Sequence, residues 1–493
     1  MHSSIARVSS LLIASMSLLG GFCWGQKAEE DATWQRRLDA QSLREDFERL
    51  YHGLRGAHAD LYVHRTKAEY DARYAQIRDS LTEPKTLFDA QVLFQQFAAY
   101  GNVAHARIEF PSEAYQAFLD KGGRQFPLYL RIHEGRAYVG ENLSGVEGIR
   151  LGDEVMALNG APIARWLQRT ATHVSADTPY IAHSFLEFTF ARYLWLELGQ
   201  QQQFFLTLRA KPGESYTVRV PARTREAMRQ ASREQPERFA LQSNERTARM
   251  LGDGVAYLRP GPFYNAENPN AMWDNGAYLA FIDGAFEQFL AADAERLIID
   301  LRDNPGGDSS FSDPMLAWIA DRPFRFCSAF LIRSSDEAAA SNQARLDASP
   351  DATAGVSARF ARDYAKTPRG ERFAFEIPWA NPREGARFEG EVVVLINRHS
   401  YSNAVNVAAT VQDYGFAVIA GEKTSDMATT YGAMEQFTLP HTGLTVGFPK
   451  AHIIRPSGDT RVDGVTPDWE IPTPIAPTAS DVVLEQLLSR MRR

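Results

Sequence analysis

The sequence predicts a multi-domain α+β protein with a helical amino-terminal region, a strand-rich middle and an α/β carboxyl-terminal region. Three observations support this fold class. The chain has 493 residues, which corresponds to about three domains of ordinary size. Apolar residues recur at helical spacing before residue 100, and short strand-like segments follow from residue 126. Beyond residue 254, buried strands alternate with helices, a pattern typical of a parallel sheet.

Residues 1–25 are predicted to be a signal peptide. Arg7 precedes an apolar run at residues 11–22, which is too short to span a bilayer comfortably, and cleavage is expected near Gly25. We therefore expect an exported protein, periplasmic or secreted, with no stable membrane insertion after cleavage. A lipoprotein attached through Cys23 is the less favoured alternative, because Phe22 fits poorly before such a cysteine.

The composition argues against several function classes. Apolar residues make up 44% and charged residues 23% of the chain, an ordinary globular balance. The net charge is −8, so there is no basic excess for binding a phosphate backbone, and nucleic acid is not an expected partner. The sequence has no HExxH, paired CxxC or EF-hand motif, so neither a metal site nor a cofactor is predicted. The oligomeric state is left open.

The amino-terminal helical domain is assigned to residues 26–118. Apolar residues at helical spacing predict helices between residues 33 and 100, and Pro84 separates the last two. Thr86 and Asp89 resemble a capping box at the start of the last helix.

The middle domain is assigned to residues 119–225. It combines strands with a helix-rich insert at residues 163–198 and a hairpin that turns near residues 211–214. Residues 223–247 are rich in Arg, Glu and Gln and predict a solvated helix or linker. The strands are predicted at 126–132, 136–143, 154–158, 204–210 and 216–222.

The carboxyl-terminal region, residues 226–493, is assigned to a single α/β core. Its strands are almost continuously apolar, so they should be buried on both faces and pair in parallel with right-handed crossovers. The strands are predicted at 255–260, 296–302, 391–397 and 416–422, and the helices at 281–292, around 315–319 and at 404–415.

Two turns of this core could carry chemistry. Gly306 and Gly307 directly follow a buried strand, and paired glycines allow backbone N–H groups to approach a ligand and hold an oxyanion. Ser400 and Ser402 lie where the next strand meets a helix, at the sheet edge where α/β folds bind ligands. From spacing alone, an ordinary turn and a serine that only caps the helix remain open alternatives.

Together these segments resemble the C-terminal processing (tail-specific) serine peptidases, a group that includes the tricorn core protease. The motifs are DLRDNPGG, VVVLINRHSYSNAVNVAATVQDYG, AVIAGEKT and VDGVTPDWEI. The segment GIRLGDEVMALNGAPI resembles part of a PDZ-like domain. The resemblance implies a PDZ-like middle domain and a catalytic core of the crotonase/ClpP-like ββα type.

The resemblance places the nucleophile at Ser402. The oxyanion hole would be formed by a glycine of Gly306–Gly307 with the N–H of Ser402 or Asn403. The Ser–Lys branch of the family has a lysine 25 residues after the nucleophile, and Met427 occupies that place here. Since methionine cannot accept a proton, that dyad is absent in its usual form.

The tricorn-like branch instead uses a histidine from the amino-terminal region, and His105 occupies the matching place. Histidine suits a general base because its ordinary pKa lies near working pH. Ala104 stands where tricorn has a serine, so another group must orient the imidazole. The resemblance points to Asp463 for this role. Lys423 is an alternative base.

Three other residues are assigned background roles. Asp413 lies about three helical turns beyond Ser402, so we expect it to be structural. His399 ranks below His105 as a base, and Cys327 is expected to be a buried apolar residue.

We therefore expect an exported serine endopeptidase that acts on peptides or unfolded proteins through an acyl-enzyme, with Ser402 as nucleophile and His105 as general base. The alternative is a non-catalytic protein that binds a peptide or small ligand and kept the protease fold, which the residues Met427 and Ala104 motivate.

Overall fold

The computed structural model describes residues 33–211, 214–234, 241, 244–348 and 355–492. The predicted signal peptide and Cys23 lie outside the described residues, so export stays a prediction. Within the described ranges no helix is long and apolar enough to cross a membrane. No group of three or more His, Cys, Asp or Glu side chains in those ranges is arranged to hold a metal ion.

The carboxyl-terminal region contains a six-stranded sheet with the order β12–β13–β14–β17–β18–β21. Every pairing from β13 onward is parallel, which confirms the predicted parallel sheet, and β12 adds an antiparallel edge. The strands are β12 (Thr247–Gly252), β13 (Val255–Arg259), β14 (Arg296–Asp300), β17 (Glu391–Ile396), β18 (Val418–Gly421) and β21 (Trp469–Glu470).

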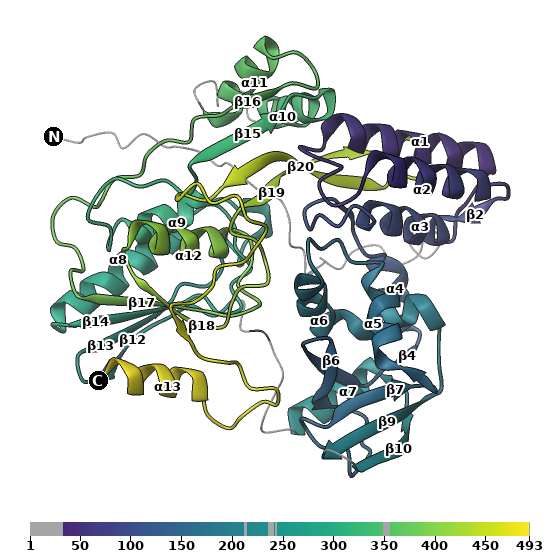
Figure 1. Ribbon diagram of the computed structural model, residues 1–493, viewed down its shortest axis with the longest axis horizontal. Helices are drawn as coiled ribbons and strands as arrows, with labels where there is room; N and C mark the ends of the chain where they lie inside the picture. The colour runs from purple at the N-terminus through teal and green to yellow at the C-terminus, as the bar shows by residue number, and fades with distance from the viewer. Residues whose placement is uncertain (1–32, 212–213, 235–240, 242–243, 349–354, 493) are drawn as a thin grey trace.

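Both faces of this sheet are buried. Helices α8 (Gly276–Ala291), α9 (Ser309–Leu316) and α12 (Asn403–Tyr414) cover one face, and α13 (Val482–Met491) covers the other (Figure 1). In β14, Leu297 and Ile299 pack on the first side, while Ile298 packs on the second. This double burial explains why the strands are almost continuously apolar in sequence.

A second sheet lies within the region that the sequence assigns to one α/β core. Its order is β16–β15–β20–β19, and the short strand β3 also pairs with β20. Its core cluster includes apolar residues of the amino-terminal helices and of helices α10 and α11. The elements are β3 (Arg107–Ile108), β15 (Ala329–Arg333), β16 (Arg372–Ala374), β19 (Thr430–Thr438), β20 (Thr445–Ile454), α10 (Asp336–Ala348) and α11 (Val356–Lys366).

The amino-terminal helices agree with the sequence prediction. They are α1 (Ala40–Ala57), α2 (Lys67–Ser80) and α3 (Leu87–Ala99), with β1 (Arg37–Leu38) and β2 (Lys85–Thr86) paired beside them and α4 (Ser112–Asp120) following. Thr86 caps α3, since its hydroxyl accepts the Asp89 N–H at 3.1 Å.

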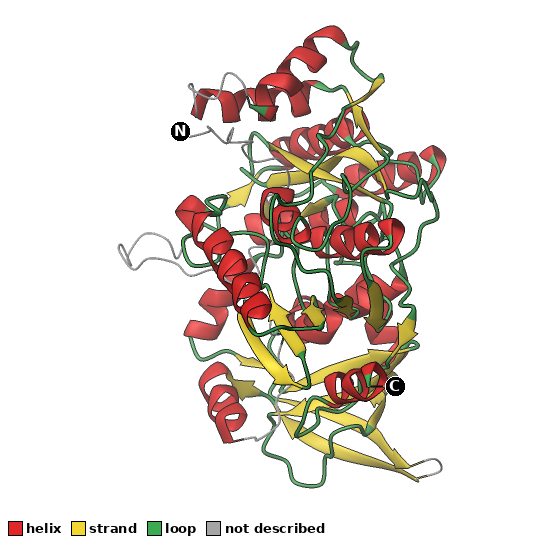
Figure 2. Ribbon diagram, turned by 90° about the vertical axis from the view of Figure 1, so that its left-hand side faces the viewer, coloured by secondary structure: helices red, strands yellow, loops and turns green. Residues whose placement is uncertain are grey.

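The middle of the chain forms an antiparallel sheet with the order β10–β9–β7–β6–β5. Helices α5 and α6 contribute to its core, and the predicted hairpin joins β9 and β10. The elements are β4 (Arg124–Gln125), β5 (Leu128–His133), β6 (Arg136–Asn142), β7 (Glu154–Leu158), β8 (Ala161–Pro162), α5 (Ile163–Ala171), α6 (Pro179–Leu198), β9 (Gln203–Lys211), β10 (Glu214–Pro221), β11 (Arg223–Thr224) and α7 (Arg225–Glu234). The turned view in Figure 2 shows the strands of the whole molecule as separate sheets with helices packed around them.

The PDZ-like assignment of the middle domain and the domain boundaries stay predictions.

Candidate active site

Ser402 lies in the turn between β17 and α12 with a backbone φ of +54°. A non-glycine residue in this region is uncommon, and such strain clusters at functional sites. Two hydrogen bonds to the end of the neighbouring strand fix this turn. The Tyr401 N–H donates to the Asn304 carbonyl at 2.9 Å, and the Ser400 hydroxyl donates to the Leu301 carbonyl at 2.7 Å. Ser400 is therefore buried and has a structural role. Ser402 is partly exposed, and its side chain does not cap the helix.

Gly306 packs directly against this turn. A Cβ at position 306 would lie 2.6 Å from the Tyr401 carbonyl oxygen, 2.7 Å from the Asn403 nitrogen and 2.9 Å from the Ser402 Cβ. Its φ of +88° also disfavours any side chain. The two turns singled out in the sequence are thus in contact, as their positions at the carboxyl ends of adjacent parallel strands require.

The backbone N–H groups of these turns are unequally available. The Ser402 N–H donates to the Asp426 carboxylate at 2.6 Å, and the Gly306 N–H donates to the Asn304 side chain at 2.8 Å. Among the hydrogen bonds of the described residues, none uses the N–H of Asn403 or Gly307. These two amides, one of them at the positive end of α12, are the groups free to bind an oxyanion.

His105 lies beside the turn at residues 401–403, which carries the candidate nucleophile, because a long-range strand pairing brings it there. It directly precedes β3, in which Arg107 and Ile108 pair with Gly447 and Val446 of β20. The imidazole stacks on the Tyr401 ring, with centroids 5.8 Å apart and an interplanar angle of 25°. The structure therefore brings His105 to the residue adjacent to Ser402.

The imidazole of His105 is enclosed and uncharged at neutral pH. Only 1% of the residue is exposed, and neither ring nitrogen has a well-formed hydrogen bond to any residue that the structure describes. Burial lowers the pKa of His105 to about 4; Arg107 adds to the lowering, while the Asp177 carboxylate and the nearby Tyr431 carbonyl oppose it.

Asp177 is a residue that the sequence did not reveal. Its carboxylate accepts the Ala104 N–H at 2.9 Å and lies 3.5 Å from His64 Nε2. Its side chain is 3% exposed. It therefore places a buried carboxylate next to the segment that carries His105.

Asp426 is a second acid that sequence reasoning missed. It accepts the N–H groups of Ser402 and Met427 at 2.6 and 2.9 Å and is fully buried. Burial raises the pKa of Asp426 to about 7, with a smaller contribution from Asp177. Because it accepts the N–H of Ser402, Asp426 is placed to position this candidate nucleophile.

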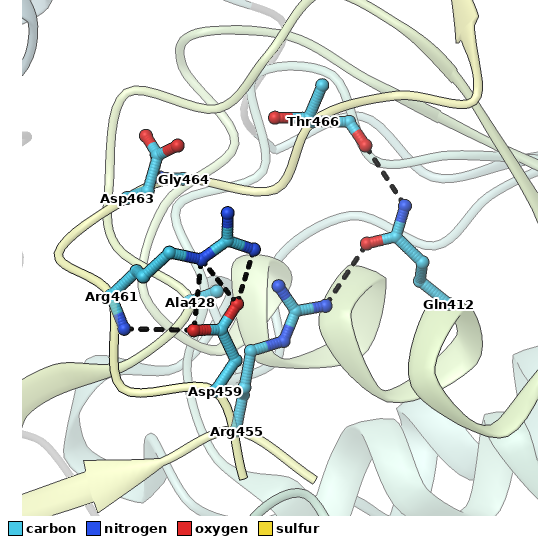
Figure 3. A pocket seen from close by; sticks show the side chains of 8 residues that line it. All are labelled: Gln412, Ala428, Arg455, Asp459, Arg461, Asp463, Gly464 and Thr466. Atoms are coloured by element: carbon cyan, nitrogen blue, oxygen red, sulfur yellow. Dashed lines mark hydrogen bonds and ion pairs between the residues drawn. The ribbon is translucent and has the colours of Figure 1, made fainter. Parts of the chain in front are cut away.

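Asp463 has a different partner from the one expected. Its Oδ1 lies 2.5 Å from Lys423 Nζ, and no hydrogen bond within the described residues joins it to His105. Figure 3 shows it at the edge of a polar pocket in which Arg461 pairs with Asp459 and Arg455 donates to Gln412 at 3.1 Å. The orienting role of Asp463 stays a prediction, and Lys423 is engaged by a carboxylate.

The residues before the nucleophile are tied to the middle of the chain. Glu187 on α6 is buried and lies 3.0 Å from Arg398 Nη1 and 2.9 Å from His399 Nε2. Arg131 on β5 pairs with the same carboxylate at 2.7 Å. Despite burial, these partners lower the pKa of Glu187 to about 2. His399 is thus committed to this network, which agrees with its lower rank as a base.

Two further predictions can be compared with the structure. Asp413 forms an ion pair with Arg455 at 2.6 Å, in agreement with a structural role. Cys327 is 1% exposed, and burial raises the pKa of its thiol to about 12, as expected for a buried apolar residue. Met427 is also buried.

Residues 275–471 match the model of peptidase family S41. Mature CPAF resembles the chain with a TM-score of 0.60 and 17% identity over 92% of this chain and 96% of that chain. Mature CPAF complexed with lactacystin has a TM-score of 0.61 and 18% identity over 92% of this chain and 97% of that chain. The photosystem II D1 C-terminal processing protease has 16% identity over 87% and 93% of the two chains, with a TM-score of only 0.41. No curated protein matches the chain.

The family match confirms the resemblance to the C-terminal processing peptidases and indicates a serine-type peptidase. The match includes Gly306, Ser402 and Asp463, whereas His105 lies outside it. At such low identity, the similarity to CPAF shows a common mixed α+β fold.

Proposed function

We propose that the chain is an exported endopeptidase in which Ser402 attacks the peptide carbonyl and His105 serves as general base. The single observation that carries the proposal is the juxtaposition at Tyr401. This residue is stacked by the His105 imidazole and is followed directly by Ser402, whose φ is +54°.

The state of His105 agrees with this role. Because the pKa of His105 is lowered to about 4, the imidazole is neutral at pH 7 and can accept a proton. As Ser402 Oγ bonds to the carbonyl carbon, its proton passes to the imidazole, and the carbonyl oxygen becomes an oxyanion. The free N–H groups of Asn403 and Gly307 would stabilise that charge.

The remaining steps follow from proton balance. The imidazolium gives its proton to the amine as the C–N bond breaks, leaving an acyl-enzyme on Ser402. A water molecule then gives a proton to His105 and attacks the ester, which releases the acid and restores the serine hydroxyl. Asp177 or Asp463 would stabilise the transient imidazolium through its negative charge. Substrates would be peptides or unfolded protein segments.

The test is labelling with a fluorophosphonate probe combined with hydrolysis of unfolded casein. We expect Ser402→Ala to lose both, with turnover reduced by roughly 10⁴-fold or more. Ser457→Ala, which changes an exposed serine, should retain both. Labelling that survives Ser402→Ala would remove the nucleophile assignment. A wild-type chain that neither reacts nor cleaves would favour the non-catalytic binding alternative.

A further inference from the structure

A cavity of about 110 Å³ opens beside the candidate site. Its walls come from the segment after His105, from the loop at 173–175 and from α6. It is large enough for several water molecules or for the end of one substrate side chain. None of the catalytic roles described above uses it.

The cavity adjoins both halves of the site. Ala104, the neighbour of His105, lines it, and so does Phe185. The Phe185 ring packs edge-on against the Tyr401 ring, with centroids 5.4 Å apart. One wall is therefore in contact with the residue that precedes Ser402, so a peptide positioned at the nucleophile could extend into the cavity.

The charge of the cavity is positive. Arg107 and Arg192 both line it, and Glu109 is the acidic residue among the lining side chains. Arg107 pairs with Glu109 at 2.7 Å, but that carboxylate is 69% exposed. Among the described residues, no carboxylate pairs with Arg192.

Arg192 is held in place by aromatic rings. Its guanidinium lies 4.9 Å from the Phe110 ring centroid and 5.4 Å from that of Tyr193. Contact with the two rings restrains the guanidinium. Its Nε is buried without a partner among the described residues, so the Nη groups are the ones that would meet a planar anion. A carboxylate is the group in a peptide that matches this geometry.

Two buried acceptors in the wall also lack partners. Gln95 Oε1 and His173 Nδ1 make no hydrogen bond within the described residues, although each residue is only 3% exposed. His173 Nε2 lies 2.7 Å from Glu197, so in the neutral ring Nδ1 is the acceptor. Buried polar atoms without partners are costly, so this wall of the cavity is maintained at an energetic cost.

We propose that this cavity is a substrate subsite that binds a peptide carboxylate through Arg192, supported by Arg107. The carboxylate would belong to a Glu or Asp side chain of the substrate. The inference rests on the proposed peptidase function, since it names the substrate class that the same site selects.

The test uses a quenched fluorogenic library of decapeptides that carry Glu or Gln at each position, with either a free or an amidated C-terminus. For the wild-type chain we expect kcat/KM to be about tenfold to a hundredfold higher for the carboxylate member of a pair. A preference for Glu over Gln at one position supports this subsite, whereas a preference for the free acid alone would assign the carboxylate to the C-terminus and overturn it. Equal rates for both members of every pair would overturn the proposal.

Arg192→Gln should reduce this selectivity ratio about tenfold, through KM, while Arg192→Lys should keep most of it. Arg219→Gln, which changes an exposed arginine of β10, is the matched control and should keep the wild-type ratio. An unchanged ratio in folded Arg192→Gln would overturn the assignment. If Arg192→Gln does not fold, Arg192→Lys and the wild-type ratio at low and high salt decide the question, because screening should reduce a charge-based preference.

Binding separates failure of this proposal from failure of the peptidase mechanism. Fluorescence anisotropy of the same peptides with Ser402→Ala should show the same carboxylate preference without turnover. If binding shows an Arg192-dependent preference but no Ser402-dependent cleavage occurs, the peptidase mechanism is excluded and the carboxylate subsite is retained. Ser402-dependent cleavage without any carboxylate preference would exclude the subsite and leave the peptidase mechanism in place.

Discussion

The nucleophile turn and the His105 segment meet at Tyr401, yet they are built in different ways. The turn at 401–403 is local: one strand, one sharp turn and one helix generate it, and the glycine turn of the neighbouring strand packs on it. The His105 segment has no such frame of its own. It is held by β3 pairing with β20, across more than 300 residues of sequence. The difference teaches that the turn of the candidate nucleophile Ser402 is formed by residues close in sequence, whereas the position of the proposed base His105 depends on the pairing of distant segments.

The largest expected effect that tests this comparison comes from His105→Gln. Removing the proton acceptor should lower kcat about 10²–10⁴-fold, although the nucleophile turn stays intact. His133→Gln changes an exposed histidine of β5 and should have no such effect. Unchanged turnover in His105→Gln would remove the base assignment.

The pH dependence of both activity and stability follows from the protonation of His105. Since the folded pKa of His105 is lowered to about 4, wild-type kcat/KM should persist below pH 6 and fall only near pH 4, where the imidazole is protonated. The unfolded chain binds this proton at a higher pH than the folded chain. The contribution of His105 to the free energy of unfolding therefore decreases as the pH falls from about 6.5 to 4. His105→Gln should flatten that part of the unfolding free-energy curve. An acidic limb near pH 6.5 would contradict the enclosed imidazole.

Gly306→Ala tests the local side of the comparison. Its Cβ would clash with the Tyr401 carbonyl and the Asn403 nitrogen, so the nucleophile turn must shift. A displacement of about 1 Å can cost roughly 10²-fold in rate. Gly370→Ala is the matched control, because Gly370 has a φ of +90° but no atom within 4 Å of the added Cβ. Both variants should lower the melting temperature through backbone strain, and only Gly306→Ala should lower kcat strongly. Equal activity losses would show that strain alone is responsible.

Asp426→Asn should have a smaller effect, about tenfold on the rate of fluorophosphonate labelling. The Ser402 and Met427 N–H groups bind different oxygens of the carboxylate, and in the amide one of these oxygens is replaced by a donating NH2 group. The folded pKa of Asp426 is raised to about 7, so its protonation contributes stability that is present below pH 4 and lost as pH rises through 7. The variant should therefore be more destabilised at pH 5 than at pH 8, as measured by denaturant unfolding. Asp293→Asn, in an exposed turn, should show neither change. Wild-type labelling by Asp426→Asn would exclude a positioning role.

The smallest effect separates Asp177 from Asp463 as the partner of His105. The Asp177 carboxylate opposes the lowering of the His105 pKa, so Asp177→Asn should move the acidic limb of kcat/KM to still lower pH and reduce kcat severalfold. Asp463→Asn, which releases Lys423, should leave that limb in place. A shift in the limb for Asp463→Asn alone would instead support the residue that the family resemblance indicates.

Much of the core was predictable because its signals are local. Strands buried on both faces were evident as apolar runs, and the predicted parallel pairing is confirmed. The hairpin of β19 and β20 was missed, although its strands are rich in apolar and β-branched residues and flank a turn that contains Gly443. Asp177 carried no recognisable motif, because its contacts to Ala104 and His64 link segments far apart in the chain.

By itself, the sequence determined the serine peptidase class, the parallel sheet and the turn that exposes Ser402. These depend on hydrophobic periodicity and on turn chemistry over a few residues. Tertiary structure alone decided that the Ser402 amide is held by Asp426, that His105 is enclosed against Tyr401 and that Arg192 lines a cavity with no carboxylate partner among the described residues. Burial and charge pairing depend on which distant segments meet, and no local pattern specifies them.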